Sequence, residues 1–194
     1  MFETILITGA AAAGKSTLSR GLAKLDYFAV FEYGEVLFQR SKVRHPTITH
    51  SETRSHSEEL ISPGDISGTD EDLQQFIASH RDVKHVIIDS HAVSKEVYGF
   101  RIEPFGPGQL QRAGFSRIVF LYCDPTVIYS RTIAHAEGRP ALTLKEAELY
   151  QLLQTSVSIN YSTILGIPIH FIDSALPPDE LKAQFLGLIG SKSH

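Results

Sequence analysis

The chain has 194 residues, of which 42% are hydrophobic and 21% charged, and its formal net charge is -4. This length favours one domain, and no segment approaches the roughly 20 apolar residues of a membrane-spanning helix. The negative charge argues against broad binding to nucleic acid, which needs a clustered excess of Lys and Arg.

The first predicted strand, Thr4–Thr8, is apolar and β-branched and leads directly into the sequence GAAAAGKS. Those eight residues, Gly9–Ser16, match the pattern G-x-x-x-x-G-K-[ST] in full, and a helix is predicted from near Lys15. The motif therefore lies between a strand and a helix, the context that a phosphate-binding loop requires. The predicted nucleotide-binding residues are Gly9, Ala10, Ala11, Ala12, Ala13, Gly14, Lys15, Ser16 and Thr17.

The chemistry of this loop favours a nucleoside triphosphate, with MgATP as the expected ligand. Backbone N–H groups and the helix N-terminus converge on the phosphates, Lys15 neutralises their outer charge, and the Ser16 hydroxyl can ligate Mg²⁺. Four alanines fill the loop. An alanine that has to adopt a left-handed backbone there would cost ~1 kcal/mol.

The second predicted strand, Tyr27–Phe31, is followed by a stretch at about 42–69 that lacks a clear helical or strand pattern. The third strand, His85–Asp89, ends in a carboxylate after three apolar residues, as a Walker B strand does. We expect Asp89 to neighbour the phosphate loop and to hold Mg²⁺, directly or through water, or to orient an acceptor. The alternative is a strand-end aspartate that caps the next turn.

The remaining elements alternate in the same way. After an irregular stretch at 90–109, the fourth strand is Arg117–Tyr122, and a helix is predicted from Asp124-Pro125 to about residue 137. A third irregular stretch, 135–142, precedes a helix that a capping box opens at Thr143 and that ends near Gly166. The three irregular stretches are predicted to be mobile surface segments.

The fifth strand is Pro168–Ile172. Strands that alternate with helices in this way predict one α/β domain over residues 1–194, with a five-stranded parallel sheet and helices on both faces. The single cysteine, Cys123, cannot form an internal disulfide, and no basic leader precedes the first strand. Both features favour a cytoplasmic location.

Read in order, five features resemble the nucleoside monophosphate kinases, most closely the archaeal-type adenylate kinases. They are the phosphate loop, Tyr33-Gly34-Glu35, Arg54, Asp89-Ser90-His91 and the segment from Arg131 to Arg139. The resemblance implies a P-loop NTPase fold with an acceptor-binding insertion at about 42–69 and a lid at about 135–142. The predicted turn begins with Glu32, where the archaeal-type enzymes carry an amide, so base specificity stays open.

The resemblance also implies roles for single residues. Tyr33 and Gly34 would open the acceptor pocket, Arg54 would contact the acceptor phosphate, and Arg131 and Arg139 would be lid arginines. Of the nine histidines, His91 alone is expected near the chemistry, at the acceptor. The predicted catalytic residues are Lys15, Asp89, Arg131 and Arg139, and the predicted Mg²⁺ ligands are Ser16 and Asp89.

The leading hypothesis is a kinase that moves the γ-phosphoryl group of MgATP to a nucleoside monophosphate. Two alternatives stay open. One is a kinase of a small hydroxyl metabolite or an RNA end, with Asp89 as the base. The other is a regulatory module that binds ATP and hydrolyses it slowly. The expected partner is a small-molecule phosphate acceptor, and neither nucleic acid nor a membrane is expected as a partner. The sequence does not indicate an oligomeric state.

Overall fold

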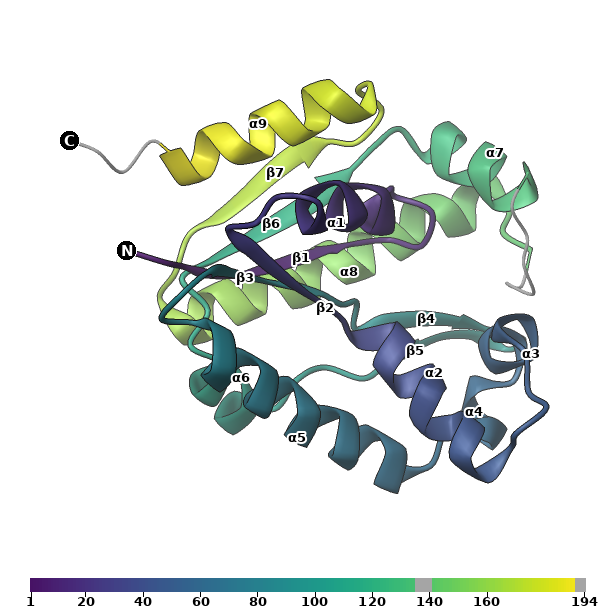
Figure 1. Cartoon of the computed structure of the whole chain (residues 1–194). Helices are drawn as coiled ribbons and strands as arrows, with labels where there is room; N and C mark the ends of the chain where they lie inside the picture. Colours follow the sequence, from purple (N-terminus) through teal and green to yellow (C-terminus); the bar gives the residue numbers. More distant parts are fainter. Residues whose placement is uncertain (135–140, 191–194) are drawn as a thin grey trace.

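A computed structural model describes residues 1–134 and 141–190, without the side chains of Arg54 and Ser55. Its elements appear in Figure 1, and in chain order they are β1 (Thr4–Gly9), α1 (Lys15–Ala23), β2 (Phe28–Glu32), α2 (Tyr33–Arg44), α3 (His50–Ser55), α4 (Ser57–Leu60), α5 (Pro63–His80), β3 (His85–Asp89), β4 (Val93–Glu96), β5 (Gly99–Ile102), α6 (Pro107–Ala113), β6 (Arg117–Tyr122), α7 (Pro125–Ala134), α8 (Leu144–Leu165), β7 (Ile169–Asp173) and α9 (Pro178–Gly190).

The central sheet has five strands in the order β2-β3-β1-β6-β7. Every neighbouring pair in it is parallel, so all carboxyl ends meet at one edge. Both the strand number and the parallel pairing predicted from the sequence are confirmed. In open sheets of this kind, ligands bind outside the carboxyl ends, where crossovers leave the sheet in opposite directions.

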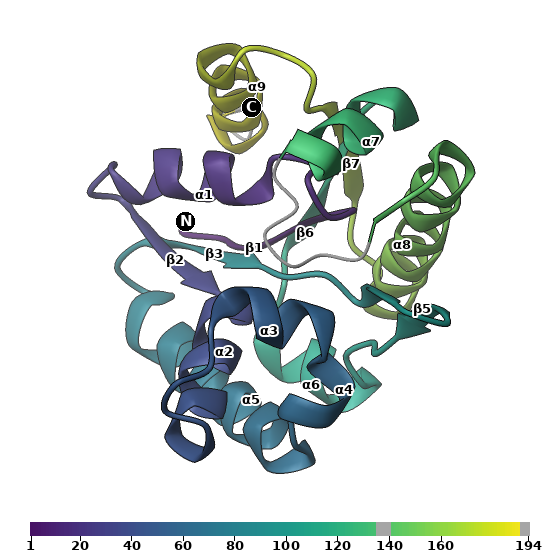
Figure 2. The same ribbon diagram turned by 90° about the vertical axis from the view of Figure 1, so that its right-hand side faces the viewer.

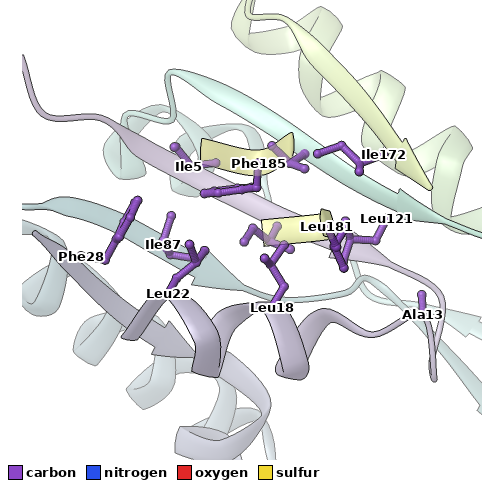
Figure 3. Close-up of a cluster of buried hydrophobic side chains, with 12 residues drawn as sticks. Ile5, Ala13, Leu18, Leu22, Phe28, Ile87, Leu121, Ile172, Leu181 and Phe185 are labelled. Atoms are coloured by element: carbon purple, nitrogen blue, oxygen red, sulfur yellow. The ribbon is translucent and has the colours of Figure 1, made fainter. Parts of the chain in front are cut away.

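Side chains alternate between the two faces of the sheet, as successive strand residues must. On one face Ile5 and Ile7 of β1 pack with Leu22 of α1 and with Leu181 and Phe185 of α9, and Figure 3 shows this layer in close-up. On the other face Leu6 packs with residues of α5, α6 and α8. Figure 2 shows the resulting arrangement, with α1 and α9 on one side of the sheet and α5 and α6 on the other.

Two strands are shifted by one residue from the prediction. β2 is Phe28–Glu32, so it ends in Glu32, and β7 is Ile169–Asp173. The predicted capping box of the long helix is confirmed, since Thr143 and Glu146 exchange hydrogen bonds with each other's backbone N–H groups. That helix, α8, ends at Gly166 in a left-handed conformation with φ 64°.

The stretch at 42–69 is more regular than the sequence suggested. It holds the end of α2, the short helices α3 and α4, and the first residues of α5. The prediction missed the start of α5 because Ser62-Pro63-Gly64 resembles a turn. Ser62 in fact caps the helix, Pro63 occupies its first turn, and Asp65 completes a capping box.

The stretch at 90–109 likewise contains structure, namely the antiparallel hairpin of β4 and β5 and the start of α6. These strands have only four residues each, too few for a clear alternation of polar and apolar residues. Of the predicted lid at 135–142, residues 135–140 lie outside the described part of the chain. In the described ranges, no helix combines the length and apolar character that crossing a membrane requires.

Candidate active site

The phosphate loop joins β1 to α1 and depends on close contact with β6. Gly9 has φ +150°, and a β-carbon there would lie 2.5 Å from the Leu121 carbonyl oxygen. Gly14, at the N-cap of α1, has φ 85°, in the left-handed region. The backbone conformation therefore favours glycine at both positions of the motif. At Gly9 the close approach of β6 is a second reason, because it leaves no room for a β-carbon.

Ala12 adopts the left-handed backbone that is costly for an alanine, with φ 60°. Replacing Ala12 by glycine is expected to raise the free energy of unfolding by less than about 1 kcal/mol. Relief of left-handed strain (roughly 1–2 kcal/mol) outweighs the larger freedom of glycine in the unfolded chain (roughly 0.5–1 kcal/mol). Urea denaturation measures this, with Ala11→Gly as the control that should lose stability. A destabilised Ala12→Gly protein would contradict the argument.

The side chain of Lys15, the first residue of α1, points back into the phosphate loop. Its ammonium group donates to the carbonyl oxygens of Gly9, at 2.9 Å, and Ala10, at 3.0 Å. The side chain is buried, with 8% of its residue surface exposed. A cation held here has weak solvent screening and stands where phosphate oxygens would meet the loop's N–H groups.

The nine predicted nucleotide-binding residues divide into two groups. Residues 11–17 line a cleft of about 1190 Å³ at the carboxyl edge of the sheet. Gly9 and Ala10 lie beneath that surface, since Ala10 is fully buried and Gly9 packs against β6.

Asp89 ends β3 beside the phosphate loop, as predicted. Its register partner in β1 is Ile7, two residues before Gly9. The carboxylate accepts a hydrogen bond from the Ser19 hydroxyl of α1 at 3.1 Å and is 7% exposed. Burial raises the pKa of Asp89, while Lys15 and the Ser19 hydrogen bond act in the opposite direction.

The site can accommodate a magnesium ion by the chemistry of its donors. Ser16 and Asp89 both line the cleft, and hydroxyl and carboxylate oxygens are the hard ligands that Mg²⁺ prefers. Residues 1–134 and 141–190 contain no group of three or more His, Cys, Asp or Glu side chains arranged for a metal. Mg²⁺ takes few protein ligands and keeps water or substrate phosphates for the rest.

Arg131 reaches the phosphate loop from α7. Its guanidinium group donates to the carbonyl oxygen of Ala12 at 3.3 Å and to that of Ser174 at 3.1 Å. The side chain lines the cleft next to the phosphate loop. Of the other predicted arginines, Arg139 and the side chain of Arg54 lie outside the described residues.

The predicted acceptor residues Tyr33, Gly34 and His91 line the same cleft. We call its part beyond the phosphate loop, between α2, α5 and the β4–β5 hairpin, the acceptor end. Here the Tyr33 hydroxyl donates to the Asp70 carboxylate at 2.9 Å, and the Gln109 amide donates to the other oxygen of that carboxylate. The ring of Tyr33 meets Phe105 edge-on at a centroid distance of 5.5 Å.

Several charged residues of this cleft were not identified from the sequence: Arg20, Glu32, Asp70, Lys95 and Arg101. Glu32 had a detectable signal, because it ends β2 as Asp89 ends β3, and the two are register partners. Burial has the largest effect on the pKa of Glu32 and raises it. The nearby Asp89 raises this pKa further, whereas Arg20 lowers it. Of the other four, Arg20 lies in α1 about one turn after Ser16, whereas Asp70, Lys95 and Arg101 reach the cleft through the packing of distant segments.

Helix α8 joins the two ends of the cleft through buried hydrogen bonds. The Gln154 side-chain oxygen accepts from the backbone N–H groups of Ala92 and Val93, both at 3.0 Å, and its amide nitrogen donates to the Thr8 hydroxyl at 2.9 Å. The Tyr150 hydroxyl donates to the Val93 carbonyl oxygen at 2.8 Å. One helix thus fixes both β1 and the hairpin strand β4.

On the other side of the cleft, ion pairs connect α2 to α5. Arg40 lies 2.7 Å from Asp72, and Arg44 contacts Asp65. These pairs bridge two helices whose facing residues line the acceptor end. The cleft therefore has two sets of connected elements around it. Hydrogen bonds join α8 to β1 and β4, and ion pairs join α2 to α5.

Comparison with known proteins gives a family and a fold. A family model described as an AAA domain matches residues 8–148. No curated protein matches the sequence.

Solved structures with a similar fold include three from bacteria. A sugar kinase from Janibacter sp. has 13% identity and a TM-score of 0.52, covering 97% of this chain and 95% of that one. A Chloroflexus aurantiacus protein provisionally assigned as a kinase has 16% identity and a TM-score of 0.59, covering 99% and 98%. The shikimate kinase of Acinetobacter baumannii, in complex with shikimate, has 17% identity and a TM-score of 0.54, covering 100% and 96%. At these identities the likeness shows the fold, an α/β P-loop NTPase fold.

Proposed function

The chain belongs to the AAA domain family, and from this premise we propose that it is an ATP-dependent kinase that moves the γ-phosphoryl group of MgATP to a small acceptor. One observation carries the proposal. Lys15, Asp89 and Arg131 line a single cleft of about 1190 Å³ that continues past the phosphate loop to Tyr33 and Phe105. Such a cleft has room for a second substrate beside the nucleotide.

Each of these residues has a role that its contacts support. The loop's N–H groups and Lys15 bind the outer phosphates, and Arg131 adds positive charge next to the loop. Ser16 and Asp89 would hold Mg²⁺, which when bound shields the charge on the phosphate oxygens. Catalysis then consists mainly of alignment and charge stabilisation, because phosphoryl transfer gives the protein little covalent work. Arg139 stays a predicted contributor to that charge.

Two acceptor classes are compatible with this chemistry. The resemblance to archaeal-type adenylate kinases favours a nucleoside monophosphate, and the position of Tyr33 and Gly34 in the lining of the cleft supports it. The carboxylates at the acceptor end favour a hydroxyl acceptor. A slow ATPase module is the third hypothesis, and it differs from both because its ADP release does not depend on an acceptor.

The function is tested by measuring ADP release from MgATP in the presence of nucleoside monophosphates, nucleosides, sugars and polyols. A kinase releases ADP faster with one class of acceptor and forms a phosphorylated product in equal amount. ADP release at the same slow rate under all conditions, without a phosphorylated product, would identify an ATPase instead.

Replacing Arg131 by alanine is expected to lower kcat about 10²-fold while changing the Kd of ATP much less. Its guanidinium group lies against the phosphate loop, and added positive charge matters most when charge develops on the transferring group. Steady-state kinetics and nucleotide titration measure the two quantities. Arg81→Ala is the matched control, because Arg81 also donates to a backbone carbonyl, that of Ala113, but outside the cleft. An equal kcat in Arg131→Ala would remove Arg131 from the mechanism.

A further inference from the structure

The cations at the acceptor end are already paired with carboxylates. Lys95 lies 3.2 Å from Glu146, and Arg101 lies 3.3 Å from Glu96 and 3.2 Å from Glu103. The His50 imidazole also lies 3.3 Å from Glu35, and it forms an ion pair there only when it is protonated. Across the described side chains that line this end, positive charge is therefore balanced before any acceptor binds.

Carboxylates also face the cleft directly. Glu32, Glu35, Asp70, Asp89 and Glu103 all belong to its lining. A phosphate monoester brings between one and two negative charges of its own at neutral pH. Glu35 and Glu103 contact His50 and Arg101, so Glu32 and Asp70 would chiefly repel such a group in this partly buried site. The group would also have to compete with Glu96, Glu103 and Glu146 for its cations. A neutral acceptor meets neither obstacle.

Glu32 is oriented toward the phosphate-loop side of the cleft. Glu32 and Asp89 are in-register partners on adjacent parallel strands, so their side chains leave the sheet on the same face. That face is fixed by Asp89, which accepts a hydrogen bond from Ser19 of α1. Glu32 is half-buried and lines the cleft, whereas Asp89 is almost fully buried and engaged with α1.

We propose that the acceptor is a neutral small molecule with hydroxyl groups, such as a sugar, polyol or nucleoside, and that Glu32 accepts the proton of the hydroxyl group that is phosphorylated. The inference rests on the proposed kinase function. In the step, the hydroxyl oxygen forms a bond to the γ-phosphorus and the bond from that phosphorus to the β,γ-bridging oxygen breaks. The electron pair leaves with ADP, and the hydroxyl proton moves to the Glu32 carboxylate.

The remaining polar groups of the acceptor end suit the same class of acceptor. Asp70 is half-buried, and each of its carboxylate oxygens accepts one hydrogen bond, from Tyr33 or from Gln109. A carboxylate oxygen has a second lone pair, so Asp70 can also accept from a substrate hydroxyl. The aromatic rings of Tyr33, Phe105 and Tyr161 line the cleft beside it and can pack against an apolar ring face.

The acceptor class is tested with the full-length protein, MgATP and a panel of neutral sugars, polyols and nucleosides set against nucleoside monophosphates. Product is identified by phosphorus NMR and ADP release is followed in parallel. A neutral compound should give the highest kcat/KM and a phosphate ester as product. A nucleoside monophosphate with the highest kcat/KM would overturn this inference and leave the proposed kinase function intact. The absence of acceptor-dependent product with every compound would contradict the kinase function, and the inference with it.

The role of Glu32 is tested by Glu32→Gln with the best neutral acceptor. The variant is expected to lose about 10²- to 10³-fold in kcat, because general-base catalysis contributes on this scale, while the Kd of ATP is unchanged. Glu32→Asp, which keeps the carboxylate, should recover part of the loss. Glu148→Gln, an exposed glutamate of α8 outside the cleft, is the matched control. Unaltered kcat in Glu32→Gln would overturn the role of Glu32, as would Asp and Gln variants of equal activity.

Discussion

Lys15→Ala is expected to lower kcat/KM for phosphoryl transfer from MgATP by about 10³-fold. The Lys15 ammonium group lies within the phosphate loop, close to the carbonyl oxygens of Gly9 and Ala10, and it is buried. Its charge is therefore weakly screened and stands where the outer phosphates bind. The transferring group is stabilised chiefly by such charge, so both nucleotide affinity and kcat should fall. Steady-state ADP release and nucleotide titration measure the two effects.

Lys24→Ala is the matched control for this prediction, because Lys24 is an exposed lysine at the end of α1 and should leave turnover unchanged. Lys15 also holds two loop carbonyls, so urea denaturation of both variants separates a loss of fold from a loss of chemistry. A folded Lys15→Ala protein with ATP affinity and turnover within a factor of ten of the wild type would exclude the proposed donor site.

Gly9→Ala is expected to lower the free energy of unfolding by about 3–5 kcal/mol, from the strained φ and the steric overlap together. A β-carbon at position 9 would meet the Leu121 carbonyl oxygen at 2.5 Å, and φ is +150°. Leu121 is the register partner of Gly9 in the centre of the sheet, so its backbone cannot easily move away. Urea denaturation followed by circular dichroism gives the difference in free energy.

Gly187→Ala tests whether any Gly-to-Ala change would do the same. In α9 a β-carbon at position 187 would have nothing within 4 Å, so this variant should gain about 0.5–1 kcal/mol from the lower flexibility of alanine. A loss of less than 1 kcal/mol in Gly9→Ala would show that β1 and β6 can separate locally, and would contradict the close approach described above.

Local patterns predicted much of the architecture. The strand before the phosphate loop and the capping box at Thr143 could both be identified because a few consecutive residues define them. The same pattern at Ser62 and Asp65 was missed, since a proline and a glycine between them suggested a turn. The rule that proline suits the first turn of a helix would have corrected this.

The two ends of the site differ in how far sequence could predict them. Lys15 and Asp89 could be predicted because a motif and a strand end place them beside each other. The contacts of Asp70 with Tyr33 and Gln109 could not, because they join residues 37 and 39 positions apart through the packing of α2, α5 and α6. Glu32 was noted only as a departure from an amide, although its position at the end of β2 matches that of Asp89 in β3.

The hydrogen bonds of Gln154 have a mechanical consequence. Because one buried side chain joins α8 to both Thr8 and the Ala92–Val93 backbone, the phosphate-loop strand and the hairpin should behave as a single rigid body. The ion pairs from Arg40 and Arg44 connect α2 to α5, and Leu73 and Ile77 of α5 pack in the same core as Leu6 of β1. A closing movement of α2 and α5 would then have to bend where β2 passes directly into α2, between Glu32 and Tyr33, and at residues 81–84 after α5.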